Sequence, residues 1–187
     1  MKKYILPFLL ILLFNFTNAQ TFIGGGGPIP DNQTAISFPL TISTIPQTAM
    51  SNTFGIENVT INITHTYDSD LNIWLIAPDN TYIELSTGNG GGGNNYTNTV
   101  FNDLSANFIT SGNAPFAGSF RPESPLYVVN NGLNPNGTWQ LYILDSYSQD
   151  AGVLNSWSIT FGPIQVNRFL LLRVIYQLLK SIRWAIP

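Results

Sequence analysis

The chain has 187 residues, of which 44% are hydrophobic, 13% aromatic and only 9% charged, and it contains no cysteine. This length allows one domain with a sizeable core, and the lack of cysteine excludes disulfide bonds and cysteine-ligated metal sites. Residues 20–166 hold all ten acidic residues but only one basic residue, Arg121, which gives this body a net charge of −9. Such a charge argues against nucleic-acid binding, because phosphate contacts require clustered Lys and Arg.

Residues 1–19 have the pattern of a secretory signal peptide. Two lysines precede an apolar run over residues 4–16, and small residues stand one and three positions before the bond between Ala19 and Gln20. The apolar run is too short to span a membrane easily, and no charged stop follows it. The sequence therefore predicts a secreted or cell-surface protein whose mature chain begins at Gln20.

The body of the chain, residues 30–162, has the pattern of an all-β domain. Apolar and polar residues alternate over residues 59–67, which indicates a half-buried strand. Residues 78–80, Pro-Asp-Asn, predict the turn of a hairpin. Many short strands joined by Gly, Pro and Asn turns favour a jelly-roll β-sandwich, with residues 20–29 as a flexible, glycine-rich leader. Strands are expected at residues 36–44, 59–67, 71–76, 81–85, 139–144 and 153–161.

Residues 163–187 form a C-terminal tail that breaks the β pattern. From residue 167 on, the tail carries four basic and no acidic residues, and Arg173, Gln177 and Lys180 form a polar stripe at helical spacing. One interpretation is a basic amphipathic helix on a membrane surface. The other is a segment foreign to the domain, such as an out-of-frame or truncated end. The abrupt change in composition favours the second, so membrane contact is expected only if the tail is genuine.

A series of short motifs runs in order through residues 30–162. The motifs are His65-Thr66-Tyr67, Asp70-Leu71, Pro78-Asp79, Phe120-Arg121-Pro122-Glu123, Gly137-Thr138-Trp139 and Leu154-Asn155-Ser156-Trp157. Together these motifs resemble the P domain, or Homo B domain, that follows the catalytic domain of subtilisin-like proprotein convertases, in its bacterial secreted form. The resemblance implies a jelly-roll β-sandwich that is not itself catalytic and that supports the folding and stability of a neighbouring protease domain.

No catalytic residues are expected in this chain. A Ser-His-Asp hydrolase needs a histidine to accept the serine proton, and the one histidine, His65, shares the apolar face of its predicted strand with Ile61 and Ile63. We therefore predict that His65 is buried and hydrogen-bonded. No serine lies in a G-x-S-x-G motif. Serine endopeptidase activity would belong to a catalytic domain that these residues do not contain.

Five loop aspartates are the candidates for a metal site: Asp68, Asp70, Asp103, Asp145 and Asp150. Calcium binds six to eight oxygen ligands from carboxylates, amides and backbone carbonyls. The alternative is that these residues only cap turns, which is a common role of aspartate. The resemblance to the P domain favours a Ca²⁺ site, because members of that family often bind calcium there, and Asp70, Asp103 and Asp145 are the first expected ligands.

The aromatic residues and Arg121 have simpler expected roles. Trp139 and Trp157 lie in strands with alternating apolar faces, which favours core packing over a sugar-stacking platform. Arg121 is expected to pair with an internal carboxylate, since the body is acidic. The residues that could instead line a surface are Trp74, Tyr82, Tyr96, Tyr127 and Tyr147.

Three functions are compatible with these patterns. The first is a secreted accessory domain that stabilises or presents a protein partner, such as a peptidase or another secreted domain, with Ca²⁺ holding its loops. The second is a carbohydrate-binding or adhesive jelly roll, which a linear patch of exposed aromatic residues on one sheet face would favour. The third is a fragment or subunit of a serine endopeptidase, which would require a second chain or domain to supply the triad.

Overall fold

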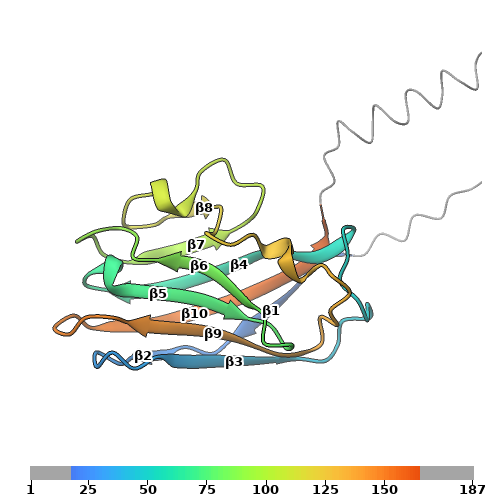
Figure 1. Ribbon diagram of the computed structural model, residues 1–187, viewed down its shortest axis with the longest axis horizontal. Coiled ribbons are helices and arrows are strands. Elements are labelled where there is room, and N and C mark those ends of the chain that lie inside the picture. The colour runs from blue at the N-terminus through green and yellow to red at the C-terminus, as the bar shows by residue number, and fades with distance from the viewer. Residues whose placement is uncertain (1–17, 165–187) are drawn as a thin grey trace, which may run out of the picture.

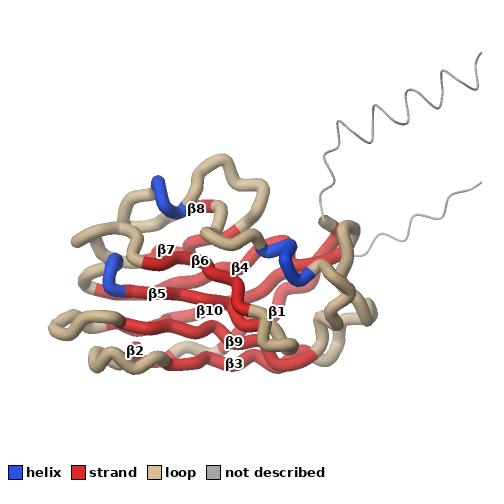
Figure 2. The backbone as a smooth tube through the Cα atoms, in the orientation of Figure 1, coloured by secondary structure: helices blue, strands red, loops and turns tan. Residues whose placement is uncertain are grey.

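The computed structural model describes residues 18–164, which form a β-sandwich of two sheets (Figures 1 and 2). Sheet A is six-stranded, in the order β1-β10-β4-β7-β8 with β2 also paired to β10, and sheet B is four-stranded, in the order β3-β9-β5-β6. The strands of sheet A are β1 (Gln20–Gly24), β2 (Gly27–Ile29), β4 (Phe54–His65), β7 (Tyr96–Phe101), β8 (Gly118–Phe120) and β10 (Gly152–Pro163). The strands of sheet B are β3 (Ile36–Ile42), β5 (Leu71–Ile76), β6 (Tyr82–Thr87) and β9 (Gly137–Asp145).

Helical structure in the described residues is limited to three short 3₁₀ turns: η1 (Asp68–Asp70), η2 (Ile109–Ser111) and η3 (Leu126–Val129). The predicted all-β sandwich is therefore confirmed. No helix within residues 18–164 is long and apolar enough to cross a membrane. The predicted signal peptide, except its last two residues, and the tail from residue 165 onward lie outside the described residues.

The core lies between the two sheets and follows the period of two that the sequence shows. In β9, Trp139, Leu141 and Ile143 are fully buried. The indole Nε1 of Trp139 donates a hydrogen bond to the carbonyl of Pro135 at 2.9 Å, and its ring packs edge-on against Phe161, with ring centroids 5.5 Å apart. Trp157 is 1% exposed. Both tryptophans belong to the core, as predicted.

The hairpin between β5 and β6 forms at the predicted turn. Asn80 has a φ of 67°, a left-handed conformation that asparagine tolerates better than most residues. The carboxylate of Asp79 accepts a hydrogen bond from the backbone N–H of Thr81 at 3.0 Å. The backbone N–H of Ala77 donates to the carbonyl of Thr81 at 2.9 Å and closes the turn. The turn preferences of Pro, Asp and Asn are therefore sufficient to explain this hairpin.

The glycine-rich residues 20–29 form β1 and β2, in contrast to the predicted flexible leader. β1 pairs with β10 from Gln20 opposite Phe161 to Gly24 opposite Trp157. Glycine is required at position 24, because a Cβ there would overlap the indole ring of Trp157. The glycines thus allow a close approach of backbone to a buried ring, and sheet A includes two strands that precede residue 30.

Candidate functional site

A buried histidine–aspartate pair marks one end of the sandwich, at the left of Figure 1. His65 is the last residue of β4 and Asp145 the last of β9, and both side chains are fully buried. The imidazole Nε2 lies 3.2 Å from the Asp145 carboxylate, and Nδ1 lies 3.0 Å from the carbonyl of Tyr67. Both ring nitrogens have partners, so the predicted buried, hydrogen-bonded histidine is confirmed.

Four aspartates gather around this end of the sandwich. Asp70 lies in η1, directly before β5, and its backbone carbonyl accepts a hydrogen bond from the N–H of Ser146 at 2.9 Å. Burial raises the pKa of the Asp70 carboxyl, and the negative charges of Asp145, Asp150 and Asp31 raise it further. Asp31 also belongs here, because its carboxylate accepts the backbone N–H of Gln149 at 3.0 and 3.1 Å. Sequence reasoning missed Asp31, since no local motif indicates which distant loop a residue will meet.

Asp68 occupies a different environment beneath the glycine-rich loop of residues 88–95. Its side chain is fully buried. One carboxylate oxygen accepts the N–H of Asn95 at 2.8 Å, whereas the other has no hydrogen-bond partner among the described residues. The backbone of Asp68 donates to the carbonyl of Gly93 at 2.8 Å. Burial raises the pKa of the Asp68 carboxyl to about 6, despite the bond from Asn95 and the nearby His65.

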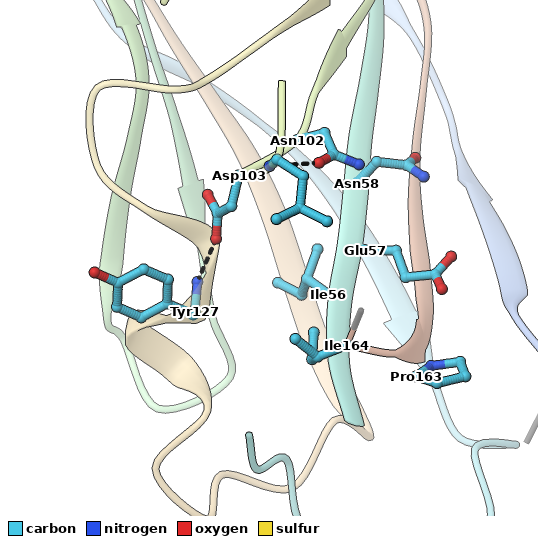
Figure 3. Close-up of a pocket in the computed structure, with 9 residues that line it drawn as sticks. Ile56, Glu57, Asn58, Asn102, Asp103, Tyr127, Pro163 and Ile164 are labelled. Atoms are coloured by element: carbon cyan, nitrogen blue, oxygen red, sulfur yellow. Dashed lines mark hydrogen bonds between the residues drawn. The ribbon is translucent and has the colours of Figure 1, made fainter. Parts of the chain in front are cut away.

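The structure does not bring Asp103 to the other four candidates. Its two carboxylate oxygens accept the N–H groups of Leu126 and Tyr127, at 2.9 and 3.1 Å, and thereby cap η3. Asp103 lies beside Ile56 near the start of β4, whereas His65 ends that strand (Figure 3). At about 3.3 Å per residue the two ends are separated by roughly 25–30 Å. For Asp103, turn capping describes the observed contacts.

No three His, Asp or Glu side chains converge as a metal-binding group within residues 18–164. A cation at the acidic end would therefore need backbone carbonyl or amide oxygens in addition to the carboxylates. Such mixed oxygen sets are typical of calcium. The clustered negative charge would attract a cation. The carboxylates of the described residues alone do not supply enough ligands to bind one.

Arg121 does not form the predicted pair with a carboxylate. Its Nε donates to the backbone carbonyl of Ser105, and its guanidinium lies 5.0 Å from the ring centroid of Phe108. Within the described residues the one basic side chain in contact with a carboxylate is that of His65, beside Asp145. Arg121 lies directly after β8 and before Pro122, which restricts the backbone there. Its side chain therefore contacts a backbone carbonyl and the face of Phe108, and not the predicted carboxylate.

An exposed apolar surface surrounds this arginine. Phe108 is 50% exposed and Tyr127 is 61% exposed. These two residues and Arg121 line a pocket of about 240 Å³ and are named here the Phe108 face. Isolated apolar residues on a surface are ordinary, but a contiguous group that includes aromatic residues and arginine is typical of protein interfaces.

A second pocket, of about 390 Å³, adjoins the Phe108 face and shares Asp103 and Tyr127 with it. It is named here the Ile164 pocket. Figure 3 shows Ile56 and Ile164 at its base, with Tyr127 on one side and Glu57 on the other. Burial raises the pKa of the Glu57 carboxyl. This pocket is the larger of the two and lies at the end of the sandwich where the described chain ends.

The aromatic residues on the outer face of sheet B do not form a flat platform. Trp74 and Tyr142 lie with ring centroids 6.0 Å apart at an interplanar angle of 56°, and Tyr82 meets Tyr142 edge-on at 77°. Stacking a sugar chain across several rings needs rings that face the same way. Of the tyrosines that could line a surface, Tyr82, Tyr127 and Tyr147 are exposed. Tyr96 is fully buried and stacks on Phe116, with ring centroids 4.8 Å apart.

The comparisons with known proteins identify the family. Residues 57–161 match the family described as proprotein convertase P-domain. The chain is 30% identical over 155 residues to leupeptin-inactivating enzyme 1 of Streptomyces exfoliatus, covering 74% of this chain and 28% of that protein. It is also 30% identical over 142 residues to the transglutaminase-activating metalloprotease of Streptomyces mobaraensis, covering 73% of this chain and 15% of that protein.

Among solved structures, a serine protease of Aeromonas sobria matches with a TM-score of 0.44 at 17% identity, over 78% of this chain and 27% of that protein. The chain therefore spans less than a third of each of these proteins. The family match, the ordered motifs and the confirmed sandwich agree, and the chain belongs to the proprotein convertase P-domain family.

Proposed function

We propose that this chain is a non-catalytic accessory domain that stabilises or presents a partner polypeptide of the protease type. The observation that carries the proposal is the Phe108 face, where exposed Phe108 and Tyr127 flank the one basic residue of the body. Aromatic residues and arginine contribute most of the binding energy in many protein interfaces. His65 supports a non-catalytic role, because the buried bonds to Asp145 and Tyr67 occupy its ring.

The two ends of the described chain favour this location for a partner. Gln20 pairs with Phe161, so the start of β1 and the end of β10 lie together. The Ile164 pocket, which adjoins the Phe108 face, includes Pro163 and Ile164 in its wall. A domain joined to either end is therefore held near the Phe108 face. Tethering raises the effective concentration of a partner without any additional contact.

A domain exchange tests the proposed function. We expect that residues 18–164, put in place of the matching region of leupeptin-inactivating enzyme 1, restore secretion of active enzyme well above the level of a deletion of that region. Phe108→Ser together with Tyr127→Ser should remove most of the gain, because the exchanged domain would lose its contact surface. The measurement is leupeptin-inactivating activity per amount of secreted protein.

Tyr82→Ser is the matched control for this exchange, because Tyr82 is 58% exposed but lies in β6 and lines neither of the two pockets. It should leave the activity of the exchanged protein unchanged. An exchange no better than the deletion would contradict the proposal. Equal losses from Tyr82→Ser and from the double substitution would place the partner elsewhere.

We further propose that the chain is exported and that Ca²⁺ stabilises it at the acidic end. Export is supported by the start of β1 at Gln20, since cleavage after Ala19 would leave that strand whole. Calcium is supported by the clustering of Asp70, Asp145 and Asp150 near Asp31, with no Lys or Arg among their partners in the described residues. A bound cation would offset the mutual repulsion of these carboxylates.

Thermal unfolding tests the calcium proposal. At a hundredfold excess over its Kd, a ligand that binds only the folded state adds about 2.7 kcal/mol of stability, which is a rise in Tm of roughly 5–10 °C for a domain of this size. We expect this rise on going from EDTA to millimolar Ca²⁺, and a smaller one with Mg²⁺, which demands tighter octahedral geometry. Asp70→Asn should remove most of the rise.

Asp79→Asn provides the control for Asp70→Asn. Asp79 is an exposed residue in the β5–β6 turn, at the far end of β5 from Asp70, and asparagine can still accept the N–H of Thr81. Its calcium response should equal that of the unaltered chain. Coincident unfolding curves in EDTA and Ca²⁺ would refute the site and leave these aspartates as turn-capping residues.

A further inference from the structure

The Ile164 pocket is an apolar hollow that is open to solvent at its rim. Ile56 and Ile164 form its base (Figure 3), and Leu104 and Tyr127 at its edge are 64% and 61% exposed. Its volume of about 390 Å³ lies within the range of pockets that bind ligands or side chains. Large apolar side chains left this exposed around a hollow indicate a surface that another chain segment covers.

The charge of this pocket is negative. Glu57 and Asp103 contribute to its lining, and no Lys or Arg does. Burial raises the pKa of both carboxyls. Two backbone N–H groups and the charge of Arg121 act against this shift of the pKa at Asp103, whereas burial acts alone at Glu57, so Glu57 is the acid that a nearby cation would stabilise most. An occupant that combines apolar side chains with positive charge would complement the pocket.

The chain itself carries such a segment directly next to the pocket. Residues 165–187 follow Ile164, which forms part of the pocket wall. They contain Arg168, Arg173, Lys180 and Arg183, no acidic residue, and mostly apolar residues otherwise. Arg168 is four residues beyond Ile164, a span of at most about 14 Å when extended. This short tether gives the segment a high effective concentration at the pocket.

We propose that residues 165–187 bind in the Ile164 pocket of the same chain, where the positive charge of the segment would complement Glu57 and its apolar composition would suit the exposed rim. The inference rests on the pocket and on the charge of the segment, and it does not depend on the proposed protease-type partner. Because Tyr127 also belongs to the Phe108 face, the bound segment would cover part of that face.

Disulfide trapping in the full chain tests this contact, and the absence of native cysteine makes the experiment clean. Leu104→Cys is combined with Phe169→Cys, and the rate of intramolecular crosslinking is measured under mild oxidation at low protein concentration. The matched control combines Tyr82→Cys, similarly exposed but in β6, with Phe169→Cys. We expect the first pair to crosslink at least tenfold faster than the control.

A charge change separates specific binding from chance contact. Glu57→Lys should slow the crosslinking of Leu104→Cys with Phe169→Cys several-fold at low salt, because it places a positive charge opposite a basic segment. Unfolding curves of the Leu104→Cys and Glu57→Lys chains verify that both fold. Equal rates for the two cysteine pairs would overturn the proposal. Crosslinks found only between chains would assign the segment to a second copy, and no crosslink together with binding to phosphatidylglycerol vesicles would assign it to a membrane surface.

Discussion

Asp68→Asn is expected to raise the free energy of unfolding by about 3 kcal/mol at pH 8 in the presence of EDTA. Burial raises the pKa of the Asp68 carboxyl from its ordinary 3.8 to about 6, and one pKa unit corresponds to about 1.4 kcal/mol. Asparagine keeps the acceptor for the N–H of Asn95 but removes the buried negative charge. The unpartnered second oxygen explains why the charge is costly.

The pH dependence of this effect has a definite sign. Because the folded-state pKa is above the unfolded value, the folded state binds the proton more tightly, and ionisation of Asp68 destabilises the fold. The cost is absent below about pH 3.8 and complete above about pH 6. The stability gained by Asp68→Asn should therefore shrink as the pH falls from 7 to 4.

Denaturant unfolding of both chains from pH 4 to pH 8 measures this difference. Asp79→Asn, at an exposed turn, should change the stability little at every pH. Loss of stability in Asp68→Asn at pH 8 would show that the ionised carboxylate is useful to the fold. A loss seen only with Ca²⁺ present would instead identify Asp68 as a ligand.

Gly24→Ala is expected to lower the free energy of unfolding by about 3 kcal/mol, the upper part of the usual range for overpacking a core. A Cβ at position 24 would overlap the indole of Trp157, which is 1% exposed and part of the hydrophobic core. Either β1 must separate from β10 or the indole must leave its position. The measurement is the midpoint of chemical denaturation, with the m-value checked for two-state behaviour.

Gly25→Ala is the matched control, because a Cβ at position 25 meets no atom within 4 Å. This change should alter the stability by no more than a few tenths of a kcal/mol. If both substitutions are equally mild, residues 20–24 do not pack as part of sheet A in solution. The pair of variants thus tests whether the domain begins at β1 or at residue 30.

The features of this protein that depend on residues close together in the chain follow from the sequence alone. The alternation in β9 and β10 placed Trp139 and Trp157 in the core, and the Pro-Asp-Asn turn placed the β5–β6 hairpin. The short motifs also identified the P domain, because each depends on neighbouring residues in one strand or turn. The burial of His65 followed from the apolar face that it shares with Ile61 and Ile63.

The tertiary structure decided what depends on residues far apart in the chain. Glycines in β1 and β2 appear flexible in sequence, but pairing with β10 more than a hundred residues later makes them part of sheet A. Asp31 and Asp70 lie at the same end of the sandwich because each accepts a hydrogen bond from the β9–β10 loop, whereas Asp103 caps η3 at the other end of β4. A loop aspartate has the same local pattern in either place. Only the packing of the two sheets determines which carboxylates share one end, and which apolar side chains remain exposed beside Ile164.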